Sequence, residues 1–149
     1  MPDAAPAEAR VFILDDEPEY AQPNIDALER RRFTVIQANS VDDAVDILTR
    51  EGTSFKVLVL DMLMPGSSSN PARDDSANPI ESGLKLHKQI RGRLGLVEVP
   101  IIFTSVVRDP KIRERIRDEE TKYKNRVSFL TKPFLPMDLI ERIKKVTAP

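Results

Sequence analysis

The sequence contains no cysteine and no tryptophan, and only five of its 149 residues are glycine. Without cysteine the chain can form no disulfide, no thiolate nucleophile and no metal site with thiolate ligands. Its few glycines form no glycine-rich loop of the kind that holds nucleotide phosphates. An excess of one charge is also missing, because 23 basic residues oppose 24 acidic ones. We therefore expect no direct binding to nucleic acid through a general positive charge.

Long hydrophobic runs are missing as well. No run approaches the length that spans a bilayer, and residues 1–8 carry acids and prolines where a signal peptide has an apolar core. These absences predict a cytoplasmic protein with no membrane contact. With 40% hydrophobic and 32% charged residues, the chain has the composition of a globular domain of ordinary size. We expect a disordered tail at residues 1–9 and one domain at residues 10–149.

Short apolar runs rich in β-branched residues are what the sequence does contain. Such runs predict strands buried on both faces, as in parallel sheets, and amphipathic segments separate them. The predicted strands cover residues 10–14, 33–37, 56–60, 99–103 and 127–130. The predicted helices lie within residues 19–31 and at about 41–50, 82–93, 110–123 and 136–146. This alternation predicts an α/β fold, a doubly wound parallel sheet with helices on both faces.

Two helix starts differ in how clearly the sequence marks them. Ser40 and Asp43 form a capping box that opens the second helix. The first helix has two candidate first positions, because Pro18 and Pro23 both suit the start of a helix. A proline well inside the helix would kink it, so this boundary stays open.

Each of four predicted strands leads into a residue that can handle a phosphoryl group. Asp15 and Asp16 follow the first strand, Asp61 the third, Thr104 the fourth and Lys132 the fifth. Ligands of open parallel sheets bind outside the carboxyl ends of the strands, so these side chains should meet at one edge. Three crowded carboxylates repel one another and call for a hard cation such as Mg²⁺. The lysine and the hydroxyl are suited to an incoming anion.

Four motifs in a fixed order carry a resemblance to a known family. They are Leu14-Asp15-Asp16-Glu17, the stretch from Leu60 through Asp61 to Pro65-Gly66, the stretch from Ile101 to Ser105, and Lys132-Pro133-Phe134. Over residues 10–146 the chain resembles the receiver domain of two-component response regulators, the CheY-like family. The resemblance implies a flavodoxin-like (βα)5 fold with strands in the order 2-1-3-4-5.

The resemblance also implies a reaction and a metal. Asp61 would be the nucleophile that accepts a phosphoryl group from a phosphohistidine on a histidine kinase or phosphotransfer protein. Mg²⁺ would be bound by Asp16 directly, by Asp15 through water, by Asp61 and by the backbone carbonyl of Met62. Taken alone, Asp61 could merely open a turn, and the adjacent acids could merely favour a helix N-terminus.

Three further residues have roles implied by the resemblance. Thr104 and Lys132 would contact the phosphoryl oxygens, and a cis bond before Pro133 would aim the lysine into the site. Thr104 and Phe129 would form a conformational switch that signals to a downstream protein, although Phe129 could instead be a plain core residue. The family implies a phosphoacceptor signalling domain, not an enzyme in the ordinary sense, and a possible homodimer.

Several features depart from the family or remain outside its pattern. Residues 66–81 are rich in Ser, Asn, Pro and Asp and read as an inserted loop, and residues 108–126 are unusually charged. Leu63 and Val106 are apolar where the mouth of the site is expected, so neither can orient water and we expect slow loss of the phosphoryl group. The only histidine, His87, is expected to be a packing or surface residue and not a phosphodonor.

Two other functions are open to this sequence. One is a receiver-like interaction module that works without phosphorylation. The intact side chains of Asp16, Asp61, Thr104 and Lys132 argue against it. The other is a doubly wound nucleotide-binding enzyme or phosphatase. No Gly-Lys-Ser/Thr follows the first strand, and the acids there are adjacent where dehalogenase-type phosphatases have them alternating. This last possibility is therefore disfavoured.

Overall fold

The computed structural model describes residues 9–62, 79–105, 110–123 and 126–148. Five strands and five α-helices alternate along these residues. The strands are β1 (Arg10–Leu14), β2 (Thr34–Ala38), β3 (Val57–Asp61), β4 (Ile101–Ser105) and β5 (Val127–Thr131). The helices are α1 (Pro18–Arg30), α2 (Val41–Glu51), α3 (Pro79–Arg91), α4 (Pro110–Lys122) and α5 (Pro136–Thr147), and a short 3₁₀ helix, η1, covers Gly52–Ser54.

The strands form one parallel sheet in the order β2-β1-β3-β4-β5. The α/β doubly wound architecture and the strand order expected from the sequence are both confirmed. Every strand therefore ends at the same edge of the sheet, which is where residues that follow the strands come together.

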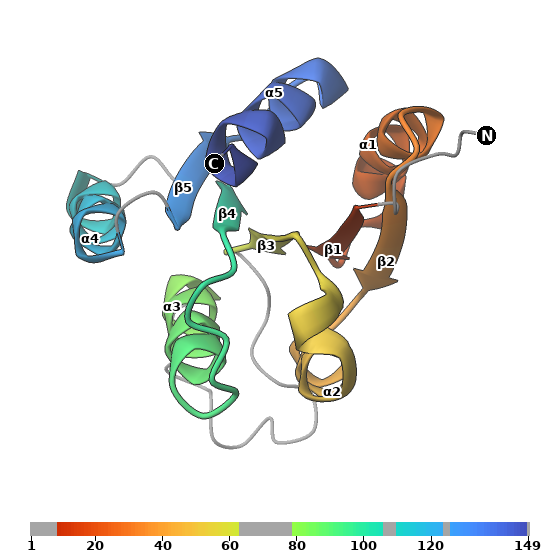
Figure 1. Ribbon diagram of the computed structural model, residues 1–149. Helices are drawn as coiled ribbons and strands as arrows, with labels where there is room; N and C mark the ends of the chain where they lie inside the picture. The colour runs from red at the N-terminus through yellow and green to blue at the C-terminus, as the bar shows by residue number, and fades with distance from the viewer. Residues whose placement is uncertain (1–8, 63–78, 106–109, 124–125, 149) are drawn as a thin grey trace.

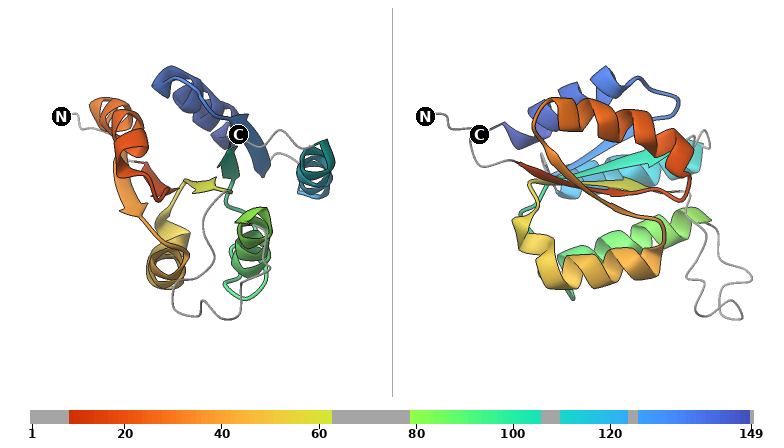
Figure 2. Two further views of the ribbon diagram at one scale, coloured as in Figure 1. Left: turned by 180° about the vertical axis from the view of Figure 1, so that it is seen from behind. Right: turned by 90° about the vertical axis from the view of Figure 1, so that its right-hand side faces the viewer.

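Helices cover both faces of the sheet, with α1 and α5 on one side and α2, α3 and α4 on the other (Figure 1; Figure 2). Alternate residues of each strand serve the two faces, as the period of a strand requires. Phe12 and Leu14 pack in the cluster with α2 and α3, whereas Val11 and Ile13 pack with α1 and α5. Within the described residues, no helix is long and apolar enough to cross a membrane.

The first helix begins at the earlier of its two candidate prolines. Pro18 occupies its first turn, where a missing N–H costs nothing, and Pro23 lies inside a helix that continues to Arg30. The predicted cap of the second helix is present, because the Ser40 hydroxyl accepts a hydrogen bond from the Asp43 amide at 3.1 Å.

The boundary predicted for the third helix is wrong by three residues. The helix begins at Pro79 and not near Ser82, so residues 79–81 of the expected loop are helical. Pro79 suits the first helical position because its ring already fixes φ near the helical value. The rest of the expected loop, together with residues 1–8 of the expected tail, lies outside the described residues.

The sheet extends further toward the site than the apolar runs alone suggest. Asp61 is the last residue of β3 and pairs in register with Thr104 of β4. The amide of Met62 then donates to the carbonyl oxygen of Thr104 at 2.9 Å. Asp61 and Thr104 are therefore held by the hydrogen-bond ladder itself, a more rigid support than a loop provides.

A buried polar network joins α4 to α3, beside the buried Ile116 of α4, which packs in the core cluster. His87 of α3 is fully buried, and its Nδ1 lies 2.8 Å from a carboxylate oxygen of Glu119 on α4. Its Nε2 accepts from the Nε–H of Arg91 at 3.1 Å, so the neutral ring carries its proton on Nδ1 and donates it to Glu119. His87 is thus a packing residue, one of the two placements expected from the sequence.

Arg91 connects this network to three backbone segments. Its guanidinium donates to the carbonyl oxygens of Leu96, Val99 and Arg126 at 3.0, 2.6 and 2.7 Å. It also lies over the ring of Tyr123, 5.3 Å from the centroid. Burial lowers the pKa of Arg91 to about 10, which still leaves it charged at neutral pH. Removing such a group would leave buried carbonyls without partners, which costs about 1–3 kcal/mol for each.

We predict that this network makes the protein less stable in mild acid. Burial lowers the pKa of His87 below 6.5, against the opposing pull of Glu119; Arg91 and Lys122 reinforce the lowering. The unfolded chain therefore takes up a proton near pH 6.5 while the folded protein does not, so stability is complete above that pH and falls below it. Urea unfolding between about pH 7.5 and pH 5.5 should show a loss of up to about 1.4 kcal/mol per pH unit.

A His87→Gln variant is the matched control, because an amide can both accept from Arg91 and donate to Glu119. His87 is the only histidine, so the variant should lose the pH dependence in this range. If the free energy of unfolding of the variant changed with pH in the same way as that of the native protein, His87 would not be the cause of the pH dependence.

Candidate functional site

Four of the residues predicted from the sequence meet at the carboxyl edge of the sheet. Asp15 follows β1, Asp61 ends β3, Thr104 lies in β4 and Lys132 follows β5. All four side chains are buried, with exposed fractions of 5, 5, 3 and 6%. Because burying a charge is costly unless it is paired, the three charged members of this group require partners of opposite charge.

The three acids form one cluster. Asp15, Asp16 and Asp61 each offer an oxygen, and these oxygens lie within 4.8 Å of one another. Both the backbone and the side chain of Asp15 are hydrogen-bonded. Its amide donates to the carbonyl oxygen of Ala38 at 3.1 Å, and its Oδ1 accepts from the Glu17 amide at 2.8 Å. Asp16, the adjacent residue, is exposed. The cluster therefore consists of two buried carboxylates and one that is exposed to solvent.

This donor set fits Mg²⁺. The ion prefers carboxylate oxygens, uses few of them and keeps several waters, so a cluster with one exposed acid suits it. Thiolate ligands are ruled out by the sequence, and the described acidic cluster contains no imidazole. Met62 follows Asp61 directly and is buried. The roles of Asp15, Asp16, Asp61 and the Met62 carbonyl as ligands stay predictions.

Lys132 provides the positive charge that faces the two buried acids. Its Nζ lies 3.2 Å from Oδ2 of Asp15 and 3.4 Å from Oδ2 of Asp61. Burial by itself would lower the pKa of Lys132, but the attraction of Asp61 and Asp15 outweighs it and the pKa is raised. The lysine is therefore charged throughout the physiological range. The Lys132–Pro133 bond is cis, as the resemblance implied.

Phe129 lies on β5, one strand beyond Thr104. It pairs in register with Phe103, is partly buried and packs against the core. The guanidinium of Arg113 on α4 lies over its ring, 5.7 Å from the centroid. The carbonyl oxygen of Phe129 accepts from Arg142 at 2.7 Å. Its role as a switch with Thr104 stays a prediction, and the arginines around it could not be placed from the sequence.

Tyr20 belongs to the site although no motif pointed to it. The Lys132 Nζ lies 4.5 Å from the centroid of its ring. The sequence offered no signal, because Tyr20 is in the first turn of a helix whose start was open between two prolines. Leu63 and Val106, expected at the mouth of the site, lie outside the described residues.

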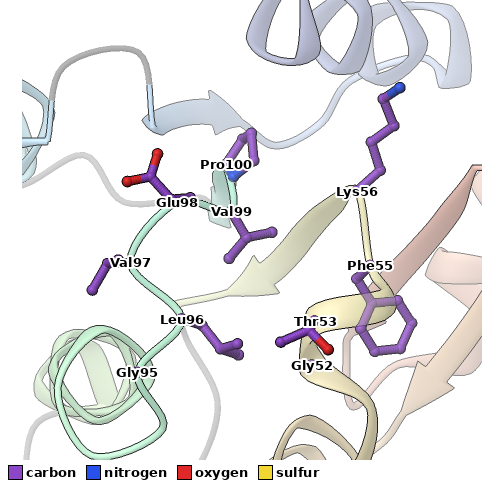
Figure 3. A pocket seen from close by; sticks show the side chains of 10 residues that line it. All are labelled: Gly52, Thr53, Phe55, Lys56, Gly95, Leu96, Val97, Glu98, Val99 and Pro100. Carbon is purple, nitrogen blue, oxygen red and sulfur yellow. The ribbon is translucent and has the colours of Figure 1, made fainter.

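A separate hollow of about 390 Å³ lies at the opposite edge of the sheet (Figure 3). One wall comes from η1 and the residues that lead into β3, and the other from the segment before β4. The lining includes Phe55, Lys56, Leu96 and Val99. It contains none of the predicted site residues. The candidate site is thus the edge cluster and not this hollow.

Comparisons with known proteins agree with this geometry. Residues 11–144 match the response regulator receiver domain family. Over 137 residues the chain is 25% identical to the phosphate regulon transcriptional regulatory protein PhoB of Klebsiella pneumoniae, which covers 92% of this chain and 51% of that protein. The same protein of Escherichia coli strain K12 is 24% identical with the same coverage. The chain spans about half the length of the curated relatives it matches.

Solved structures show the same fold. A putative response regulator from Chloroflexus aurantiacus matches with a TM-score of 0.71 and 22% identity, covering 96% of this chain and all of that one. The chemotaxis response regulator CheY4 of Vibrio cholerae matches with a TM-score of 0.68 and 21% identity, covering 94% and 99%. The receiver domain from the hybrid histidine kinase CckA matches with a TM-score of 0.65 and 24% identity, covering 93% and 99%.

The structural likenesses carry the fold alone, whereas the family match covers most of the chain and includes all the edge residues described above. The chain belongs to the response regulator receiver domain family of two-component systems.

Proposed function

We propose that the domain accepts a phosphoryl group on Asp61 from a phosphohistidine donor, in a reaction that depends on Mg²⁺, and then signals to a partner protein. One observation carries this proposal. The Lys132 ammonium lies within 3.4 Å of the buried Asp61 carboxylate at the edge where Asp15 and Asp16 complete an acidic cluster.

The charge of the cluster explains why a cation is needed. Three carboxylates and one ammonium leave an excess of two negative charges. An incoming phosphoryl group adds more negative charge, so an uncompensated cluster would repel its own substrate. A bound Mg²⁺ would offset these two charges, so that the cluster no longer repels the phosphoryl group. Asp15, Asp16, Asp61 and the Met62 carbonyl are the groups that would hold it.

The protein's own residues position the transfer. A carboxylate oxygen of Asp61 forms the new bond to phosphorus, while the bond from phosphorus to the donor's imidazole nitrogen breaks and its electron pair leaves on that nitrogen. Lys132 can swing its N–H donors from the carboxylates to the phosphoryl oxygens. The Thr104 hydroxyl, held by the β4 ladder next to Asp61, supplies a further donor.

The signal to the partner protein is proposed to pass through β4 and β5, which carry Thr104 and Phe129. A Thr104 drawn toward the phosphoryl group would release space beside Phe129 and shift the balance between two conformations. The curated relatives are named transcriptional regulatory proteins, but this chain spans about half their length. The identity of the downstream protein, a homodimer and the cytoplasmic location stay predictions.

A receiver-like module that works without phosphate is not favoured. Such a module would have no need for a buried lysine paired with two buried acids, an arrangement that is costly to desolvate and easily replaced by apolar side chains.

We expect one phosphoryl group to be added when the protein is incubated with acetyl phosphate and Mg²⁺. The adduct forms on the Asp61 carboxylate, and intact mass spectrometry measures it directly. Omission of Mg²⁺ should abolish the adduct, because the acidic cluster then repels the donor.

An Asp61→Asn variant is the control, since the amide keeps the shape of the side chain but cannot attack phosphorus. A folded native protein that gains no mass would sink the proposal, and so would an adduct that persists in the variant.

The phosphoryl group is predicted to persist once it has formed. Leu63 and Val106 are apolar and cannot orient an attacking water, so hydrolysis has no assisting group from these two positions. A Leu63→Asn variant should lose its phosphoryl group about ten-fold faster, as expected for one added polar group that positions water. The decay of the mass adduct over time measures this, and equal decay in both proteins would overturn the idea.

A further inference from the structure

We propose that Tyr20 is a positioning residue that holds the Lys132 ammonium against the face of its ring. This inference rests on the proposed function, because it assigns a supporting residue to the lysine of the same site. It differs from the roles expected of the acids, the hydroxyl and the lysine, none of which lies on α1.

The contacts of the ammonium show why it needs a third partner. Its Nζ lies 3.2 Å from Asp15 and 3.4 Å from Asp61, both longer than the 2.7–2.9 Å of a strong charge-assisted hydrogen bond. The carboxylates therefore attract the lysine without fixing it closely. The Tyr20 ring lies 4.5 Å from the same nitrogen, well inside the range of a cation–π contact.

The backbone and the ring of Tyr20 each have a supporting contact. The Tyr20 amide donates to the Glu17 carbonyl oxygen at 2.9 Å, in the first turn of α1. The ring of Phe134 meets it edge to face, with centroids 6.2 Å apart and planes at 76°. Tyr20 thus contacts the residues on either side of Pro133, and it joins the start of α1 to the segment that follows β5.

An aromatic face suits this position better than another acid would. A ring attracts the ammonium through its quadrupole but accepts no conventional hydrogen bond, so the N–H donors stay available for phosphoryl oxygens. A further carboxylate would compete for those donors and add to the repulsion in the cluster. The ring can hold the lysine in place both before and after the phosphoryl group arrives.

The hydroxyl of Tyr20 is not the part that acts. It is buried and has no hydrogen-bond partner among the described residues. A buried hydroxyl without a partner contributes nothing favourable to the fold, so phenylalanine should serve at this position. If the ring face is the part that acts, Tyr20→Phe should behave as the native protein does because it keeps the ring. Tyr20→Leu should not, because it removes the ring.

The first test is an NMR measurement on the unphosphorylated protein without metal. The Cε of Lys132 is bonded to the nitrogen that lies 4.5 Å from the centroid of the Tyr20 ring, so its protons should resonate upfield of those in an ordinary lysine. The upfield shift should remain in Tyr20→Phe and disappear in Tyr20→Leu. Tyr20→Met is a second ring-free variant in case the leucine variant fails to fold.

The second test is the rate of phosphorylation by acetyl phosphate with Mg²⁺. Loss of the ring should slow the reaction about three- to ten-fold, the range expected for one cation–π contact, and Tyr20→Phe should restore the native rate. Phe33→Leu is the matched control, because it removes a partly buried ring that lies just before β2, at the edge of the sheet away from Lys132. It should keep the upfield shift.

The two readouts separate this inference from the proposed function. A native protein that takes up no phosphoryl group would refute the function, while the NMR shift would still decide whether Tyr20 holds Lys132. An unshifted lysine in the native protein would overturn the inference. Slow phosphorylation of the Tyr20→Phe variant would overturn it as well. So would a Tyr20→Leu variant that is phosphorylated as fast as the native protein.

Discussion

The contact between the Lys132 ammonium and the carboxylates of Asp15 and Asp61 is the interaction on which the site depends. Two buried acids within reach of a third would repel strongly, and the lysine offsets only part of that repulsion. The remaining negative charge suits the site to a metal cation. Under the proposed function, the lysine has to be held in place and still be able to move toward an incoming phosphoryl group.

The sheet and its helices serve this contact in different ways. The strands fix Asp61 and Thr104 through the ladder, and α1 brings Tyr20 beneath the lysine. On the other face, α4 is joined to α3 by the buried network of His87, Arg91 and Glu119. Polar networks of this kind hold elements in one specific arrangement, because an alternative packing leaves buried groups unsatisfied.

Much of the site could be predicted from the sequence because strand ends in a parallel sheet converge. Asp15, Asp61, Thr104 and Lys132 each follow or end a recognisable apolar run, so their meeting at one edge needs only the topology. Tyr20 could not be found this way. Its position depends on where α1 begins and on the course of the chain after β5, and neither has a periodic signal.

Arg91 and the start of α3 were missed for related reasons. A charged residue in an amphipathic helix ordinarily faces solvent, and only the tertiary structure shows that Arg91 turns inward to three carbonyls. The polar stretch before Pro79 resembled a loop, and the proline that ends it is also a suitable first residue of a helix. The polar residues around it predicted a loop through residue 81 instead.

The most direct test of the claim that the acidic cluster attracts a cation is a titration of the unphosphorylated protein with Mg²⁺. The titration is followed by the NMR signals of the backbone amides of residues 15–17 and 61–62. We predict saturable shifts of these amide signals. In Asp16→Asn the affinity for Mg²⁺ should fall about ten-fold or more, because one of the three carboxylate charges facing the ion is removed. Asp46→Asn, an exposed acid on α2, should bind Mg²⁺ as the native protein does. Equal affinity in the native protein and Asp16→Asn, or changes confined to other parts of the sheet, would contradict it.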